Sequence, residues 1–353
     1  MGNSDKFGQK HYMIRCIQLA RKGMGNTLSN PLVGSVVVHN EKIIGEGYHR
    51  KFGENHAEVN AIQSVRNKDL LKDSTIYVNL EPCSHSGKTP PCTDLILRSG
   101  IPSVVIGTID TSSKSAGKGI ERLRKKGCKV KEGILENECR QLNKRFFTFH
   151  EKHRPYVILK WAQSSDGFID IKREVNDKSG PNWISGPYER VLVHKWRSEE
   201  QAILVGTRTV KTDNPELNVR DWGGNSPFRL VIDRTLKLST DYKVFDDPNH
   251  SIVFTSESEN ANRPHKTKKL DFTKSIWPQI MSYLVEMEIA SVLVEGGSKT
   301  LQSLISSGLW DEARVFTGFQ EFEEGVIAPK IEVTHNRLYH TWQSDLKIYC
   351  NKS

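Results

Sequence analysis

Apolar residues recur along the first half of the chain with the periods of helices and strands. Met13, Ile14, Ile17 and Ala20 follow helical spacing, which predicts a helix over 10–23. Two β-rich runs on either side of the polar segment 39–42 predict a hairpin. Strands that alternate with helices indicate an α/β fold with some parallel pairing. We expect further helices at 57–65, 93–100, 118–127 and 136–150, and strands at 74–80, 103–108 and 128–134.

The polar segment EKHRP separates this half from a second one. Its Pro155 disfavours continued helix, so we place a boundary near residue 150, which gives domains 1–150 and 151–353. Between Ser165 and Glu189, a segment rich in Gly, Pro, Asn and Ser predicts a long loop, and such loops are often functional. The second domain also has an α/β pattern, with strands at 155–164, 228–234, 250–256, 291–297 and 312–318 and helices at 278–288 and 299–308.

Composition indicates the compartment. The chain has 353 residues, of which 36% are hydrophobic and 26% charged, as in ordinary globular proteins. We find no apolar run long enough for a signal peptide or a membrane span, and six cysteines are too sparse for a disulfide framework in a chain of this length. We therefore expect a cytoplasmic protein with reduced thiols and no membrane partner.

The net charge of +9 raises the question of nucleic-acid binding. The densest basic run, RLRKKGCKVKEG from Arg122, has its basic residues at mixed helical spacings, so a solvated helix face explains it better. A small phosphorylated substrate accounts for the charge equally well. We expect such a substrate, no nucleic-acid partner, and assembly into a homo-oligomer.

Four residues carry the first candidate chemistry. His56 and Glu58 open a predicted helix, and Cys83 and Cys92 each follow a proline. One imidazole and two thiolates bind zinc and leave its fourth tetrahedral position open for water, whose acidity the metal raises. Glu58 would pass the proton of that water to a departing amine, as the non-ligand Glu of zinc nucleobase deaminases does. Residues two apart on a regular helix point in nearly opposite directions, so His56 and Glu58 converge only at an irregular first turn.

Two other interpretations remain open for these residues. Each residue is ordinary when taken alone, because thiols are common and Glu58 fits a first-turn acid favoured by the helix dipole. A structural zinc site would need a fourth protein ligand, for which His85 is the nearest candidate. In such a closed site no water would bind the metal, so Glu58 would have no proton to transfer. The joint pattern favours a catalytic zinc site.

Read together, HAEVNAI, NLEPCSHSGKTPPC and SNPLVGSVVV closely resemble the deaminase half of the bifunctional riboflavin-biosynthesis family called RibD or RibG. Cytidine and transfer-RNA adenosine deaminases have their two cysteines three apart, whereas Cys83 and Cys92 are nine apart, a spacing typical of the riboflavin family. EGYH, DTSSKSAGKGI and QLNKRFF extend the resemblance over nearly all of the first half. It implies a cytidine-deaminase-like, three-layer domain that binds Zn²⁺.

The resemblance also implies which residues hold the substrate, a pyrimidinone that carries a ribosylamino group and a phosphate. These residues are Asn30, His49 and Lys88. An amide can read a base edge, and a lysine is a point charge for phosphate. Asn30 before Pro31 also fits an ordinary turn residue, and Lys88 a surface lysine, so those interpretations stay open.

The second half resembles the reductase half of the same family, which implies a dihydrofolate-reductase-like α/β fold and NADPH. No GxGxxG follows a strand, so the Rossmann fingerprint is absent. In VEGGSKTLQSLI, two glycines after a strand allow close approach, and the next helix offers free N–H groups to a phosphate, although glycine pairs are also common in turns. The resemblance is carried by LKWAQSSDG, NWIS, AILVGTRTVKTDNPELNVR and VEGG.

Matching positions imply the contacts of the reductase. Lys160 and Asp213 would polarise or protonate the opened, imine-like ribose carbon, although Lys160 in an apolar strand also fits a snorkelling residue. Two arginines suit a phosphate because each binds it bidentately, although both also fit surface charges. The implied substrate contacts are Arg197, Leu217, Arg220 and Glu295, and the implied dinucleotide contacts are Ala162, Trp183, Thr209, Asp213, Gly297, Ser298, Lys299, Thr300, Leu301, Gln302 and Ser303.

The C-terminal part departs from the family. Many relatives have an APKLLGG-like segment, whereas FTGFQEFEEGVIAPKI carries its glycine earlier, so the contacts of Phe316 to Lys330 are not carried over. The whole pattern predicts an enzyme that hydrolytically deaminates a phosphoribosylamino-pyrimidinone and then reduces its ribosyl chain to ribityl with NADPH. Three alternatives stay open: a nucleic-acid-editing deaminase, a deaminase with an inactive second domain, and a non-enzymatic zinc module.

Overall fold

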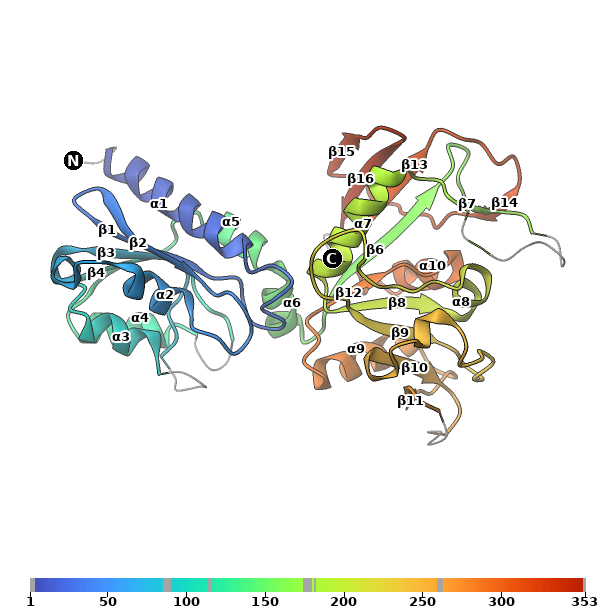
Figure 1. Cartoon of the computed structure of the whole chain (residues 1–353), viewed down its shortest axis with the longest axis horizontal. Helices are drawn as coiled ribbons and strands as arrows, with labels where there is room; N and C mark the ends of the chain where they lie inside the picture. The colour runs from blue at the N-terminus through green and yellow to red at the C-terminus, as the bar shows by residue number, and fades with distance from the viewer. Residues whose placement is uncertain are drawn as a thin grey trace. The chain divides into compact units, whose positions relative to one another are not determined.

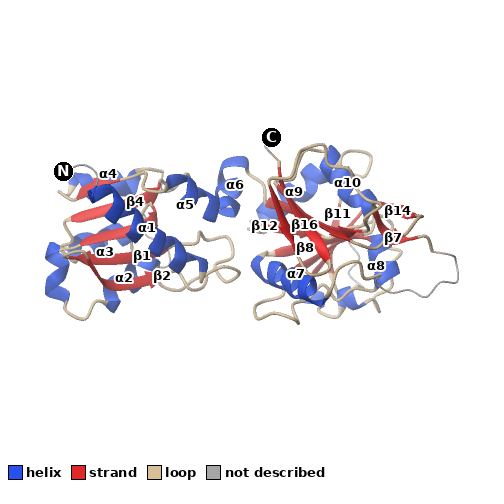
Figure 2. Cartoon of the chain, turned by 90° about the horizontal axis from the view of Figure 1, so that it is seen from above, coloured by secondary structure: helices blue, strands red, loops and turns tan. Residues whose placement is uncertain are grey.

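The computed structural model describes residues 4–84, 90–112, 116–173, 180, 182–258 and 263–351. The chain divides into two compact units, Met1–His153 and Arg154–Ser353 (Figure 1). Each unit has its own sheet with helices packed against it (Figure 2). Among the described residues, no helix combines the length and the apolar character needed to cross a membrane.

The first unit is built on a five-stranded sheet in the order β2-β1-β3-β4-β5. β1 pairs antiparallel with β2 and β3, and the other neighbours are parallel. Its strands are β1 (Gly34–His39), β2 (Lys42–Tyr48), β3 (Thr75–Leu80), β4 (Ser103–Thr108) and β5 (Lys129–Lys131). Its helices are α1 (Ser4–Arg21), α2 (Ala57–Ser64), α3 (Cys92–Arg98), α4 (Lys118–Lys125), α5 (Glu136–Leu142), α6 (Lys144–Lys152) and the 3₁₀ helix η1 (Lys68–Asp73).

Alternate residues of these strands face two separate cores. Val37 and Ile76 pack in the core that includes α2, α3 and α4, whereas Val36 and Tyr77 pack in the core that includes α1 and α5. The unit is therefore the three-layer fold that the resemblance implied. The structure differs from the prediction at one helix: the expected helix over 136–150 is divided into α5 and α6 at Asn143, whose backbone is not helical (φ −100°, ψ 23°).

The second unit has a nine-stranded sheet in the order β11-β10-β9-β8-β12-β6-β13-β16-β15. Neighbours are parallel from β11 to β13 and antiparallel at β13, β16 and β15. Its strands are β6 (Tyr156–Gln163), β8 (Ala202–Gly206), β9 (Phe228–Ile232), β10 (Ser251–Thr255), β11 (Lys266–Lys269), β12 (Ser291–Val294), β13 (Glu312–Gly318), β15 (Arg337–His340) and β16 (Ser344–Cys350). Its helices are α7 (Pro187–Glu199), α8 (Thr207–Asp213), α9 (Ile276–Glu286), α10 (Ser298–Ser306), and the short η2 (Lys243–Phe245) and η3 (Pro248–His250).

Helices cover this sheet on two faces. Trp277 of α9 and Leu301 of α10 belong to one core, and Val193 of α7 and Val210 of α8 belong to the other. The result is the α/β fold expected for the second half. The stretch between Ser165 and Glu189 is not all loop, however, because it contains β7 (Phe168–Ile171), which pairs with β14 (Gly325–Ile327), and the start of α7. Residues 174–179 and 181 lie outside the described part of that stretch.

Candidate functional site

Three predicted metal ligands of the first unit lie together. His56 directly precedes α2, Cys83 follows β3, and Cys92 begins α3. Their donor atoms all lie within 4.8 Å of one another, with Nδ1 of His56 3.6 Å from Sγ of Cys83 and 3.3 Å from Sγ of Cys92. Hydrogen bonds from Cys92 and His56 outweigh burial and lower the pKa of the Cys83 thiol to about 4. An imidazole and two thiols in this arrangement fit the donor set of a zinc ion.

Glu58 lies beside these ligands because the helix begins irregularly. His56 is the N-cap residue of α2, with extended backbone (φ −69°, ψ 163°), and Glu58 follows in the first turn. This placement supplies the irregular geometry that allows the two side chains to converge. Glu58 is only 3% exposed, and burial raises its pKa to about 7. A carboxyl group with a pKa near neutrality can both accept and release a proton.

Two of the residues implied to hold the substrate lie next to the metal ligands. Nδ2 of Asn30 is 3.1 Å from Nε2 of His49, and Nδ1 of His49 is 3.1 Å from the carbonyl of Asn55. The rings of His49 and His56 are in edge contact, with centroids 5.6 Å apart. Burial lowers the pKa of His49, which favours the neutral imidazole. The structure does not describe Lys88, the third residue implied to hold the substrate, or His85, the alternative fourth metal ligand.

Glu81, which the sequence analysis did not single out, supports the loop next to Cys83. Its buried carboxylate accepts the backbone N–H groups of Asp110, Gly117, Gly119 and Ile120 at 2.8–3.2 Å. The available signal was its position directly after a predicted strand and two residues before Cys83. It holds Asp110 and the backbone at residues 117–120 against the end of β3.

The basic run of the first unit pairs with neighbouring acids. Arg122 lies 2.5 Å from Asp94, and Lys125 lies 2.6 Å from Glu121. Arg124 lies 3.2 Å from Glu132. These side chains are largely exposed, so the arrangement is that of a solvated helix face with interspersed charges.

The second unit contains a cavity of about 830 Å³ at the carboxyl ends of the neighbouring parallel strands β8, β12 and β6. Ligands of open α/β sheets bind at this edge. Most of the residues implied by the resemblance line it, namely Lys160, Ala162, Trp183, Arg197, Thr209, Asp213, Leu217, Arg220, Glu295, Gly297, Ser298, Lys299 and Thr300. β14, within the divergent segment from Phe316 to Lys330, also lines it with Gly325, Val326 and Ile327.

The cavity lining includes only the first turn of α10. Leu301 is fully buried in the core, and Oγ of Ser303 accepts the Nε1–H of Trp277 at 2.8 Å. Oε1 of Gln302 accepts the backbone N–H of Lys330 at 2.8 Å. Successive helix residues point about 100° apart, so the side chains beyond Thr300 turn away from the cavity. Of the residues implied to contact the dinucleotide in this helix, Gly297 to Thr300 line the cavity and Leu301 to Ser303 do not.

The start of α10 has space and donors for a phosphate. Gly297 is its N-cap residue and no side chain caps the helix, so its first N–H groups have no side-chain partner from the cap position. A Cβ atom at Gly296 would lie 2.8 Å from Cβ of Thr300, and one at Gly297 would lie 3.3 Å from Oγ1 of Thr209. The absence of a Cβ at these two positions therefore lets the backbone before α10 pack closely against Thr300 and Thr209, which both line the cavity.

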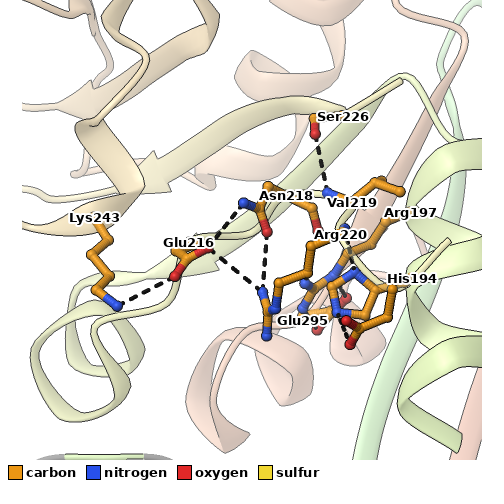
Figure 3. A network of polar contacts seen from close by, with 10 residues as sticks. His194, Arg197, Glu216, Asn218, Val219, Arg220, Ser226, Lys243 and Glu295 are labelled. Carbon is orange, nitrogen blue, oxygen red and sulfur yellow. Dashed lines mark hydrogen bonds and ion pairs between the residues drawn. The ribbon is translucent and has the colours of Figure 1, made fainter. Parts of the chain in front are cut away.

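A buried charge network forms the cavity wall (Figure 3). Nε and Nη2 of Arg197 each donate to the carboxylate of Glu295 at 2.9 Å, and Nη1 donates to the carbonyl of Asn218 at 3.2 Å. Nζ of Lys160 lies 3.9 Å from Glu295. Burial alone would raise the pKa of Glu295, but Arg197 and Lys160 outweigh it and lower the pKa to about 2. Burial also lowers the pKa of Lys160.

This network bears on the expectation that Arg197 and Arg220 both bind a phosphate. The guanidinium of Arg197 is already bound bidentately by Glu295, so it is not a free phosphate clamp. Arg220 lines the same cavity, and its guanidinium lies 3.1 Å from Asn218 Oδ1 and 3.8 Å from Glu216. Of the two, Arg220 is the one whose side chain is exposed at the cavity.

His194 is a residue of this site that the sequence analysis missed. Its Nδ1 accepts the backbone N–H of Arg220 at 3.3 Å, and its Nε2 lies 3.4 Å from the carboxylate of Asp221 (Figure 3). The available signal was its position three residues before Arg197 on one helix, which places the two on the same face. His194 holds the backbone that carries Arg220.

Asp213 faces the cavity from the last turn of α8. Burial, and then the charge of Asp170, raises its pKa to about 6 against the opposing effect of Arg173. Asp170 is held by Arg173, whose Nε and Nη2 donate to it at 2.9 and 3.0 Å. The cavity thus contains one carboxyl group that binds a proton near neutral pH.

Comparisons with known proteins match both units. The family model of the cytidine and deoxycytidylate deaminase zinc-binding region matches residues 8–108, and that of the RibD C-terminal domain matches residues 155–318. The riboflavin biosynthesis protein RibD of Aquifex aeolicus is 40% identical over 91% of this chain and 87% of its own length. That of Escherichia coli is 32% identical over 91% and 88%.

A solved structure is also similar to this chain over nearly its whole length. It is the diaminohydroxyphosphoribosylaminopyrimidine deaminase and 5-amino-6-(5-phosphoribosylamino)uracil reductase of Thermotoga maritima. It is 39% identical, covers 98% of this chain and 99% of its own, and superposes with a TM-score of 0.89.

Proposed function

Because this chain belongs to the RibD family of riboflavin-biosynthesis proteins, we propose that each of its two units carries one of the family's two reactions. The chain is a bifunctional deaminase and reductase. We assign the deaminase to the unit that contains His56, Cys83 and Cys92, and the reductase to the unit that contains the 830 Å³ cavity.

In the first unit, the substrate is a diaminohydroxyphosphoribosylaminopyrimidine, as named for the Thermotoga maritima protein. His56, Cys83 and Cys92 would hold zinc, which supplies Lewis-acid activation of water. Water adds to the ring carbon that carries the amino group, and ammonia leaves. Glu58 takes the proton from the attacking water and returns it to the departing amine. Asn30 and His49 hold the pyrimidine beside Glu58.

In the second unit, the deaminated product is reduced from a ribosyl to a ribityl side chain. NADPH supplies the hydride when bound, and the N-terminus of α10 with Gly296 and Gly297 holds its phosphates. Asp213 supplies the proton that accompanies the hydride, and Lys160 lines the same cavity. Arg220 binds the phosphate of the substrate.

The observation that carries this proposal is the convergence of His56, Cys83 and Cys92 beside the buried carboxyl group of Glu58. The test supplies purified protein with the diaminopyrimidine ribosyl phosphate and NADPH, and follows ammonia release and NADPH oxidation separately. We expect ammonia first and NADPH oxidation after it. Ammonia without NADPH oxidation would leave only the deaminase assignment, and neither product would reject both assignments.

A further inference from the structure

Two buried amides of the first unit hold the backbone of a single residue, Leu32. Oδ1 of Asn143 accepts the N–H of Leu32 at 2.7 Å, and Nδ2 of Asn143 donates to the Leu32 carbonyl at 3.0 Å. Nδ2 of Asn79 donates to the same carbonyl at 2.9 Å, and its Oδ1 accepts the N–H of Gly34 at 2.7 Å. Asn79 and Asn143, at 0% and 2% exposure, are here called the amide clamp.

The amide clamp joins segments that are far apart in the sequence. Asn79 lies in β3, four residues before Cys83, and Asn143 lies between α5 and α6. An asparagine that precedes a helix commonly caps it through its side chain. The side chain of Asn143 makes no cap bond to α6, and its amide binds Leu32 instead. Its placement therefore indicates a role for the Leu32 segment and not for the helix.

The clamped segment positions both residues that lie next to the metal ligands. Asn30 is two residues before Leu32, and the carbonyl of Val33 accepts the backbone N–H of His49 at 2.9 Å. The side chains of Asn30 and His49 meet at 3.1 Å, and His49 contacts the ring of His56. The backbone of this short segment thus sets where Asn30 and His49 stand relative to the metal ligands.

We propose that Asn79 and Asn143 are positioning residues of the deaminase, which fix Asn30 and His49 for the substrate without touching it. The inference rests on the proposed role of Asn30 and His49 in holding the substrate. Removing the amide of Asn143 takes the partner from the N–H of Leu32, and removing that of Asn79 takes the partner from the N–H of Gly34, so the segment relaxes in either case. A displacement of about 1 Å at a binding residue is enough to weaken its interaction strongly. Both variants keep the side chains of the three metal ligands, and only Cys83 lies close in sequence to a clamp residue, Asn79, so we expect zinc to be retained.

The test uses the full, zinc-loaded chain and measures both activities. Asn79→Ala and Asn143→Ala are made separately, so that one variant remains informative if the other does not fold. Ser74→Ala is the matched control, because Ser74 is also buried in the first unit and its Oγ donates to the carbonyl of Leu70 at 2.6 Å. We expect each asparagine variant to raise the deaminase KM about tenfold and to change kcat less than about threefold. Zinc content and NADPH oxidation with the deaminated intermediate should match the wild type in every variant, as should the deaminase KM of Ser74→Ala.

Two results would overturn the inference. One is a KM within about twofold of the wild type in folded, zinc-loaded Asn79→Ala and Asn143→Ala. The other is a loss of zinc together with kcat, which would give the amides a general structural role. Asn30→Ala and His49→Ala are measured alongside. If they raise KM and the clamp variants do not, only the positioning inference fails. If they leave KM unchanged, their proposed role in substrate binding fails, and the inference fails with it.

Discussion

Arg197 and Glu295 form a bidentate ion pair in the wall of the reductase cavity, although they are 98 residues apart in the sequence. Their side chains are 11% and 10% exposed. Glu295 also lies near Lys160, so one carboxylate balances two buried cations. Removing one member of a buried pair is strongly destabilising because the other charge remains without compensation.

Glu295→Gln should therefore destabilise the second unit by about 3 kcal/mol and abolish NADPH oxidation. All seven tryptophans of the chain lie beyond residue 160, so unfolding of this unit can be followed by tryptophan fluorescence during denaturant titration. Glu312→Gln breaks a comparable buried pair, Arg314–Glu312 at 2.6 Å, outside the cavity lining. This control should lose stability but keep the KM for both reductase substrates. An active Glu295→Gln variant of wild-type stability would contradict the prediction.

Glu58→Gln should abolish ammonia release and leave the metal in place. The amide keeps the size of the side chain but cannot carry a proton, so we expect kcat to fall about 10³-fold. Zinc content is measured by atomic absorption, and NADPH oxidation with the deaminated intermediate reports on the second unit in the same sample. Loss of zinc in this variant would make Glu58 a ligand, and normal ammonia release would remove it from the proton transfer.

The sequence predicted the deaminase site more fully than the reductase site for a physical reason. His56, Glu58, Cys83 and Cys92 lie at the ends of helices and strands that local patterns predict. α7 was not predicted, because its buried face mixes the polar Glu189 and His194 with the apolar Val193 and Trp196, whereas Tyr188 is 73% exposed. Such a helix shows no continuous apolar face in the sequence.

Long-range pairing explains the other differences between sequence and structure. Nothing local in the sequence indicates that Glu295 binds Arg197 or that Asn143 binds Leu32, because hydrogen-bond partners of this kind are set by the fold. β7 is short and pairs only with the three-residue β14, so the segment containing it resembled a loop. The predicted helix over 136–150 contains no glycine or proline, so the sequence did not indicate that it is divided at Asn143.

Gly296→Ala should weaken NADPH binding. The added Cβ would lie 2.8 Å from Cβ of Thr300, which is fixed to the first turn of α10, so the helix start must move. We expect the KM for NADPH to rise about tenfold, since the N–H groups of this turn would no longer meet the phosphate. Gly223→Ala is the matched control, because its Cβ would meet nothing within 4 Å. Equal NADPH KM values in the two variants would contradict the prediction.

Asp213 should give the reductase a pH dependence with a definite sign. Its pKa of about 6 is above the ordinary value of 3.8, so the folded protein holds this proton more tightly than the unfolded chain. The stability gained from protonation is complete below about pH 4 and is lost as the pH rises through 6. The proton required with the hydride is lost over the same rise. We therefore expect kcat/KM for NADPH oxidation to decline above pH 6.

Asp213→Asn separates this titration from other effects of pH. The amide remains neutral at every pH but has no proton to release, so we expect NADPH oxidation to fall about 10²-fold and its decline above pH 6 to disappear. Asp241→Asn, an exposed carboxyl replacement in the same unit and outside the cavity, should keep the wild-type profile. The measurement is the initial rate of NADPH oxidation from pH 5 to 8 for the wild type and the two variants. A flat wild-type profile, or a decline that persists in Asp213→Asn, would assign the proton to a group other than Asp213, and Lys160 would then be the next residue to replace.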